Sequence, residues 1–208
     1  MRNFPERFFV SGTDTGIGKT VVSAMLTLGL DGTYWKPIQS GLHEETDSEL
    51  VKRVTGLSDQ RVLEERYRLQ EPLSPHASAA LDQVSIHLHD FELPEISNLP
   101  LVVEGAGGLL VPLNEEDMII DLIKYLELPV LLVSRSELGT LNHTFLSLEA
   151  LRNRSIPILG VVMNGPKNQS NREAIEHYGN TEVLAEIGPL PEISPDLLEK
   201  EFDKNFSR

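Results

Sequence analysis

Runs of consecutive apolar residues alternate along the chain with longer segments in which apolar residues recur every three or four positions. The short runs are typical of strands covered on both faces, and the longer segments are typical of helices. The predicted strands are Phe8–Ser11, Thr33–Ile38, Leu101–Glu104, Val130–Ser134, Ile158–Met163 and Glu182–Ile187. The predicted helices are Lys19–Leu30, Asp47–Thr55, Pro75–Leu81, Asp117–Leu126, Leu141–Asn153, Arg172–Tyr178 and Pro195–Phe206. This alternation predicts a three-layer α/β fold, in which helices cover both faces of a mostly parallel sheet.

The length, net charge and composition of the chain exclude several classes of partner and site. The 208 residues are expected to form one domain, 1–208. The net charge of −14 argues against nucleic-acid and anionic-membrane partners. No apolar run has the length of a signal peptide or a membrane span, so a cytoplasmic protein is expected. The chain has no cysteine, which excludes disulfides, thiolate metal sites and a cysteine-dependent glutaminase within it.

The first strand is followed by a glycine-rich turn, residues 12–20, that opens the first helix. Glycines let successive N–H groups point at an anion, and the helix N-terminus adds partial positive charge. Lys19 would reach the β- and γ-phosphates of a nucleotide, and the Thr20 hydroxyl would ligate Mg²⁺. Five residues separate Gly12 from Gly18, where the common pattern has four. The turn is therefore a variant phosphate-binding loop of the phosphate-loop NTPase type.

Polar residues follow two other predicted strands, where ligands collect in parallel sheets. Lys36 ends the second strand and would neutralise charge on a transferring phosphoryl group, although a solvated edge lysine gives the same pattern. Glu104 ends the third strand and would organise Mg²⁺, and residues 105–108 leave bare backbone able to approach a phosphate. The alternative for Glu104 is an ordinary solvated carboxylate.

Two further positions are ambiguous on local grounds. Asp47 is a second candidate around the metal, but an acid in the first turn of a helix is favoured by the helix dipole whatever its function. Asn164 and Gly165 follow the fifth strand, where an amide would read an adenine edge or simply form a turn.

In this order along the chain, the motifs resemble the dethiobiotin synthetase family. The resembling segments are Gly12-Thr13-Asp14-Thr15 with Gly18-Lys19-Thr20, Lys36-Pro37 with Ser40-Gly41, Glu71-Pro72 with Ser74-Pro75-His76, Val103-Glu104-Gly105-Ala106-Gly107-Gly108, and Leu138-Gly139 with Asn142-His143. The loop alone occurs in many ATPases, whereas the combination is much more selective.

The resemblance implies a reaction in which 7,8-diaminopelargonic acid, CO₂ and ATP give dethiobiotin, ADP and phosphate, with Mg²⁺ required. A carbamate would be phosphorylated to a mixed anhydride, and the second amine would close a cyclic urea. The family's roles would make Lys36 and Lys19 catalytic, and Thr20, Asp47 and Glu104 the Mg²⁺ ligands. The implied ATP-binding residues are Thr15, Gly16, Ile17, Gly18, Lys19, Thr20, Val21, Asp47, Glu104, Gly105, Ala106, Gly107, Asn164, Gly165, Gly188, Pro189 and Leu190.

The resemblance also implies a homodimer with shared active sites. Ser40 and Gly107 would contact substrate, and Thr140, Leu141 and Asn142 would hold the substrate carboxylate of the partner subunit. Gly16 stands where some members carry Glu, and the segment 83–98 is shorter than the helix expected there. The alternative is a regulatory or partitioning ATPase of the same superfamily. Such proteins usually carry an extra lysine early in the loop, which this chain lacks.

Overall fold

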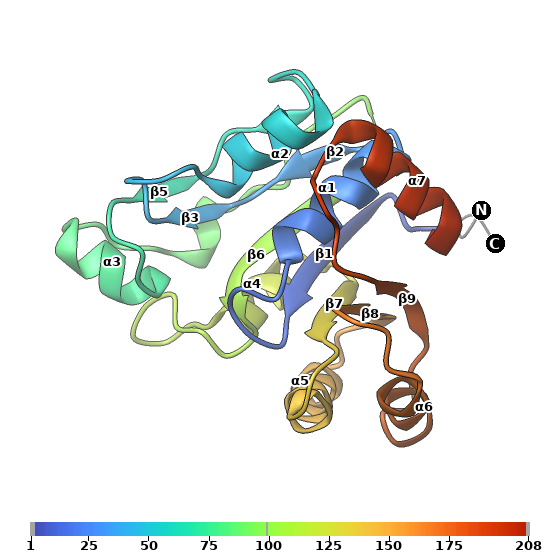
Figure 1. Cartoon of the computed structure of the whole chain (residues 1–208). Coiled ribbons are helices and arrows are strands. Elements are labelled where there is room, and N and C mark those ends of the chain that lie inside the picture. Colours follow the sequence, from blue (N-terminus) through green and yellow to red (C-terminus); the bar gives the residue numbers. More distant parts are fainter. Residues whose placement is uncertain (1–2, 99, 207–208) are drawn as a thin grey trace.

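The computed structural model describes residues 3–98 and 100–206, and its centre is a seven-stranded sheet (Figure 1). The strands follow the order β4-β2-β6-β1-β7-β8-β9, and all neighbouring pairs are parallel. Their bounds are β1 Arg7–Gly12, β2 Thr33–Trp35, β4 Val62–Leu63, β6 Leu101–Gly108, β7 Val130–Arg135, β8 Ile158–Asn164 and β9 Val183–Ile187. The predicted α/β fold with a mostly parallel sheet is confirmed.

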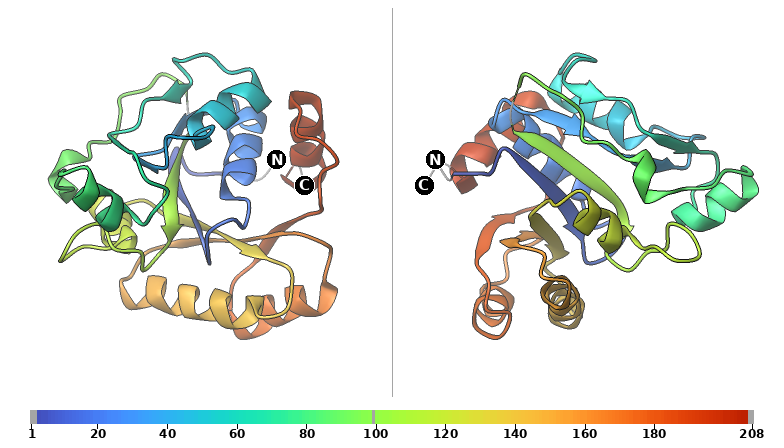
Figure 2. Two further views of the ribbon diagram at one scale, coloured as in Figure 1. Left: turned by 60° about the vertical axis from the view of Figure 1, so that its left-hand side comes forward. Right: turned by 180° about the vertical axis from the view of Figure 1, so that it is seen from behind.

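Helices cover both faces of this sheet, because successive apolar residues of each strand point to opposite sides. In β1, Phe8 and Val10 belong to one core, and Phe9 belongs to the other. The first face carries α1 (Lys19–Gly29), α2 (Asp47–Thr55) and α7 (Pro195–Phe206). The second carries α4 (Ile119–Tyr125), α5 (Thr140–Asn153) and α6 (Gln169–Tyr178). Figure 2 shows α5 and α6 side by side beneath the sheet.

The segment predicted as one strand, Thr33–Ile38, is instead divided between two sheets. β2 ends at Trp35, and β3 (Ile38–Ser40) pairs with β5 (Tyr67–Leu69) in a separate two-stranded sheet. Pro37 lies at the break, because proline has no N–H for a strand ladder. Lys36 therefore follows the last residue of β2 directly, at the carboxyl end of that strand.

Other differences concern a strand end, short elements and helix starts. β6 continues to Gly108, so Glu104 lies within the strand rather than at its end as predicted. The two- and three-residue strands β4 and β5 were not predicted, since so few residues show no clear periodicity. α4 begins at Ile119 rather than Asp117, α5 at Thr140 rather than Leu141, and α6 at Gln169 rather than Arg172. Helix α3 (Pro75–Leu81) matches its prediction, and the segment 83–98 holds a short 3₁₀ helix, Leu88–Asp90.

The chain crosses the sheet in both directions from β1, which lies between β6 and β7. Strands β6, β2 and β4 lie on one side of β1, and β7, β8 and β9 on the other. In such sheets the crevice at the carboxyl ends of the strands, where the direction reverses, is the usual ligand site. The turn between β1 and α1 lies at this point, so the fold positions residues 12–20 for binding.

The contact between α1 and α7 gives a test of the packing. A methyl group at Gly29 would overlap the ring of Phe202, whose side chain is buried. We expect Gly29→Ala to lower the free energy of unfolding by about 1–2 kcal/mol, because overpacking outweighs the helix-propensity gain of about 1 kcal/mol. Chemical denaturation would measure it.

The same substitution in a Phe202→Ala background serves as the control. There the methyl group has space, so we expect the Gly29→Ala penalty to disappear. A Gly29→Ala protein as stable as the parent would contradict this account of the helix contact.

Candidate active site

The turn between β1 and α1 has the backbone of a phosphate-binding loop. Gly16 and Gly18 have φ values of 69° and 87°, which L-residues with side chains rarely adopt. Gly18 precedes the first residue of α1, and its conformation directs the helix N-terminus toward the loop. Lys19 is 7% exposed, and its Nζ donates to the carbonyl oxygen of Asp14 at 3.0 Å. The Lys19 side chain therefore folds back over the loop and contacts its backbone.

Asn164 holds this loop from the end of β8. Its Nδ2 donates to the carbonyl oxygen of Ile17 at 2.8 Å, and a Cβ at Gly18 would overlap the same amide. Gly165, the next residue, donates its N–H to the carbonyl oxygen of Ile187 at 2.8 Å. The candidate adenine segments, 164–165 and 188–190, therefore lie at neighbouring strand ends beside the loop.

A buried cluster of charges lies beside the loop, between two strands and two helices. Lys36 Nζ lies 2.7 Å from Asp47 Oδ2 and 3.2 Å from Glu104 Oε1, and it also donates to the Gly105 carbonyl oxygen at 3.3 Å. The Thr20 hydroxyl lies 2.8 Å from Asp47 Oδ1 and 2.9 Å from Glu104 Oε1. Because this hydroxyl has one hydrogen, it donates to one of these carboxylates at a time. The structure thus brings Lys36 into contact with the predicted carboxylates, and those carboxylates into contact with Thr20.

The elements explain why these side chains converge. Tyr34 pairs with Val102 across β2 and β6, so Glu104, two residues further, projects on the same face as Tyr34. Asp47 begins α2 directly after Thr46, whose hydroxyl accepts the Glu49 N–H while the Glu49 carboxylate accepts the Thr46 N–H. This capping box fixes the direction in which α2 starts. The Asp47 N–H also donates to Gln39 Oε1 at 3.2 Å.

Burial and pairing shift the pKa values in opposite directions. Burial lowers the pKa of Lys36, but Glu104 and Asp47 outweigh it and the net pKa lies above the ordinary value. Burial raises the pKa of Asp47, but Lys36, together with the Thr20 hydroxyl and Lys19, outweighs burial and the net pKa is lowered. Burial lowers the pKa of Lys19, and Glu104 offsets this only in part. Lys36 and Asp47 are therefore held in their charged forms.

The donor set suits Mg²⁺. Thr20, Asp47 and Glu104 offer hard oxygen atoms at one place, and Mg²⁺ in nucleotide sites commonly uses one or two carboxylates together with phosphates and water. Within residues 3–98 and 100–206, no group of three or more His, Cys, Asp or Glu side chains is placed to hold a metal by itself.

One hollow adjoins the cluster, and a second lies on the other side of Thr15 and Val111, which line both. The first, of about 340 Å³, is lined by Thr15, Lys36, Gln39, Ser40, Asp47, Pro72, Leu73, Ser74, Pro75, Ala106, Gly107 and Val111. The other, of about 320 Å³, lies between the loop and α5 and is lined in part by Asp14, His143 and Leu146. The predicted substrate contacts Ser40 and Gly107 thus share the first hollow with Lys36 and Asp47.

The start of α5 differs in detail from what the sequence suggested. The Thr140 N–H donates to the Glu137 carbonyl oxygen at 3.1 Å, and the Thr140 hydroxyl donates to that of Arg135 at 2.6 Å. In the part of the chain that the structure describes, the N–H groups of Leu141 and Asn142 donate no hydrogen bond. Those two groups, rather than Thr140, are the free donors at this helix start.

Three residues of the site are not among those predicted from the sequence. The Tyr34 hydroxyl lies 3.1 Å from Glu104 Oε2, and burial together with Glu104 raises the Tyr34 pKa well above its usual value. The Arg135 guanidinium lies 2.7 Å from the Asp14 carboxylate of the loop. Gln39 contacts Asp47 as described above. A register of β2 against β6 would have identified Tyr34, because it stands two residues before Lys36.

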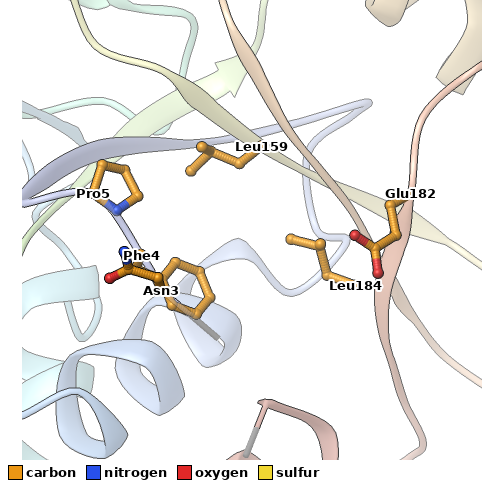
Figure 3. A pocket seen from close by; sticks show the side chains of 6 residues that line it. All are labelled: Asn3, Phe4, Pro5, Leu159, Glu182 and Leu184. Carbon is orange, nitrogen blue, oxygen red and sulfur yellow. The ribbon is translucent and has the colours of Figure 1, made fainter. Parts of the chain in front are cut away.

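A further hollow, of about 260 Å³, lies at the opposite ends of the strands from the loop (Figure 3). Asn3, Phe4 and Pro5 line it just before β1, together with Leu159 of β8 and Glu182 and Leu184 beside and within β9. These are the amino ends of the strands, far from the loop. The hollow therefore does not belong to the candidate active site.

Comparisons with known proteins agree with this geometry. A family model described as an AAA domain matches residues 6–196. The ATP-dependent dethiobiotin synthetase BioD of Brucella ovis is 51% identical over 200 residues, covering 96% of this chain and 94% of that protein. The protein of the same name from Brucella abortus is 50% identical with the same coverage.

Solved structures with little sequence identity share the fold. A putative plasmid partition protein of Borrelia burgdorferi bound to AMPPNP superposes with a TM-score of 0.56 at 10% identity, covering 99% of this chain and 98% of that one. The cell division ATPase MinD of Pyrococcus furiosus gives a TM-score of 0.52 at 17% identity, covering 90% and 85%. Across residues 3–98 and 100–206, no helix is both long and apolar enough to cross a bilayer. The identity to the curated relatives over nearly the whole chain is what assigns the protein, and this chain belongs to the dethiobiotin synthetase family.

Proposed function

We propose that this protein is an ATP-dependent dethiobiotin synthetase of biotin biosynthesis. It would join CO₂ to 7,8-diaminopelargonic acid and close a cyclic urea, with release of ADP and phosphate. The observation that carries the proposal is the cluster of Lys36, Asp47, Glu104 and Thr20 beside the phosphate loop, at a hollow that also contains Ser40 and Gly107. This reaction develops negative charge on several oxygen atoms, and it needs no nucleophilic side chain.

The proposed roles follow from the position of each charge. Lys19 and the loop N–H groups would hold the β- and γ-phosphates of ATP. Lys36 would turn from its carboxylate partners toward the carbamate and stabilise charge on the transferring phosphoryl group. The N–H groups and glycines of residues 104–108 would approach the phosphate or substrate. Mg²⁺, held by Thr20, Asp47 and Glu104, would supply additional positive charge against the phosphates.

Adenine recognition is proposed for Asn164, Gly165 and the loop Gly188-Pro189-Leu190. Because the Asn164 Nδ2 already donates to Ile17, its Oδ1 is the atom that can accept a hydrogen bond from the adenine amino group. The protein is further proposed to act in the cytoplasm, without nucleic-acid or membrane partners, consistent with its charge of −14.

ATP turnover tests the reaction directly. A partitioning ATPase shares the fold but has no use for a diamine, whereas a synthetase needs one to complete its cycle. ATP hydrolysis should therefore rise strongly when diaminopelargonic acid and bicarbonate are both added. Turnover that ignores both would favour the regulatory ATPase.

Replacement of Lys36 should remove most of the catalysis. Losing one preorganised positive charge of this kind lowers turnover by roughly 10²–10³-fold, and we expect a value in that range for Lys36→Ala at saturating substrates. The change also leaves Asp47 and Glu104 facing each other. Because the Asp47 side chain is 32% exposed, the stability loss should be roughly 1–3 kcal/mol, below the range for a fully buried pair.

The assay is therefore run well below the melting temperature of each variant, measured in the same buffer. Lys124→Ala, at an exposed position on α4, is the matched control and should keep full turnover. Near-normal turnover by folded Lys36→Ala would remove Lys36 from the mechanism.

The proposed metal ligands give a separate test. Asp47→Asn and Glu104→Gln should each raise the Mg²⁺ concentration for half-maximal activity, by at least about 10-fold, the size typical of losing even an outer-sphere partner. The measurement is activity against Mg²⁺ at fixed ATP. Asp59→Asn, which removes an exposed carboxylate paired with Lys52, is the control. An unchanged Mg²⁺ midpoint in both site variants would return these carboxylates to a purely structural role.

We further propose a homodimer in which each site uses the start of α5 from the partner subunit. The free N–H groups of Leu141 and Asn142, with Thr140 before them, form a carboxylate-binding helix start. Leu110 and Leu146, which are 56% and 57% exposed, line the same hollow beside the loop, and Leu138 just before α5 is 102% exposed. A second subunit would cover this apolar surface.

Subunit mixing tests the shared site. Two inactive variants are combined, Lys36→Ala and Asn142→Asp, the second placing a negative charge at the proposed carboxylate site. In a mixed dimer one site would collect both defects and the other neither. With free exchange about half the dimers are mixed, so roughly a quarter of all sites should recover. No recovery despite proven exchange would place each site within one chain.

A further inference from the structure

Tyr34 is a fully buried residue whose hydroxyl contacts the active-site cluster. Its side chain is 0% exposed and belongs to the core beneath α1 and α2. Its hydroxyl lies 3.1 Å from Glu104 Oε2, on the side of the carboxylate away from Thr20 and Lys36. The Glu104 side chain is itself 1% exposed, so solvent contributes little to its orientation.

The two oxygens of Glu104 thus have different partners. Oε1 lies 2.9 Å from the Thr20 hydroxyl and 3.2 Å from Lys36 Nζ, whereas Oε2 meets Tyr34. The terminal torsion of a glutamate is soft, so a carboxylate held at one oxygen alone can turn. Because a tyrosine hydroxyl donates to the second oxygen, the plane of this carboxylate is fixed from both sides.

A purely structural role does not account for the hydroxyl. Phenylalanine would fill the same space in the core without placing a polar group where water cannot reach. A buried hydroxyl that lacks a hydrogen-bond partner is destabilising, so this position favours tyrosine over phenylalanine only when the hydroxyl is hydrogen-bonded. Glu104 provides the hydrogen-bond partner for the Tyr34 hydroxyl.

We propose that Tyr34 is a positioning residue of the active site, which holds Glu104 Oε2 so that Oε1 is presented to the place shared by Thr20, Asp47 and Lys36. The inference rests on the magnesium site proposed above. Tyr34 lies in β2, paired with β6, so its position is set by the large sheet. Asp47, the other carboxylate, begins a helix and is 32% exposed, so it has more freedom to adjust. Tyr34 therefore makes Glu104 the rigid half of the pair.

The test is metal binding by Tyr34→Phe, which keeps the ring and removes only the hydroxyl. Mn²⁺ serves as the probe, and its free concentration is followed by electron paramagnetic resonance with a non-hydrolysable ATP analogue present. We expect the Mn²⁺ affinity to fall about 10-fold, as for other outer-sphere partners of metal ligands. Thermal melting of the same sample establishes that the variant is folded.

Tyr67→Phe is the matched control. Tyr67 is 8% exposed, and its hydroxyl also donates to a carboxylate, that of Asp90, away from the active site. Both substitutions therefore remove a tyrosine–carboxylate hydrogen bond, but only Tyr34→Phe should change Mn²⁺ affinity. An equal loss of affinity in Tyr67→Phe would mean a general structural effect, and it would overturn the proposal.

A double-substitution cycle separates this inference from the metal site itself. If Tyr34 acts through Glu104, Tyr34→Phe should add almost nothing to the loss already caused by Glu104→Gln. If Glu104→Gln weakens Mn²⁺ binding and Tyr34→Phe does not, Tyr34 has no positioning role and the metal site stands. If neither variant changes the affinity, the metal site fails and the inference fails with it. Additive losses would also refute action through Glu104.

Discussion

The pairing of the Lys36 ammonium with Asp47 and Glu104 is the interaction on which the site depends. Lys36 and Glu104 are nearly fully buried, and isolated charges at such depth would be strongly destabilising. The buried charges are therefore stable only when they are paired with one another. The three side chains come from the end of β2, the start of α2 and β6. Together with Lys19 the cluster carries two positive and two negative side chains. A polyphosphate brought to this neutral site needs added positive charge, which explains why the proposed function includes Mg²⁺.

The parallel sheet is what allows so distant a set of residues to meet. Lys36 and Glu104 are 68 positions apart in sequence, yet β2 and β6 are neighbours with the same direction. The break at Pro37 matters here as well. Because the strand ends before Lys36, this lysine is free of the ladder, and residues 38–40 enter a second small sheet that forms one wall of the hollow. The proline that interrupts the predicted strand therefore separates Lys36 from the strand ladder and directs the chain into the wall of the hollow.

Local patterns were informative to different degrees for different residues. The loop 12–20 carries its own glycines and lysine, so its conformation and location followed from a short segment. Asp47 had an equally good local explanation as a helix-start acid, and only the family resemblance indicated a metal role. In the structure both descriptions hold, since Asp47 begins α2 and also contacts Lys36 and Thr20. For Thr140 the local pattern was misleading. It suggested a free N–H at the helix start, but that N–H donates to the Glu137 carbonyl oxygen within its own turn.

By itself the sequence determined the α/β class, six of the main strands to within a few residues, and the position of the phosphate loop. Those features depend on periodicity, glycine and proline, which act over a few residues. Tertiary structure alone decided the strand order, the short strands β4 and β5, and the role of Tyr34. A tyrosine in an apolar run looks like any core residue, and its hydroxyl acquires meaning only when the register of β2 against β6 places Glu104 beside it. Such pairings join residues far apart in the chain, so no local pattern encodes them.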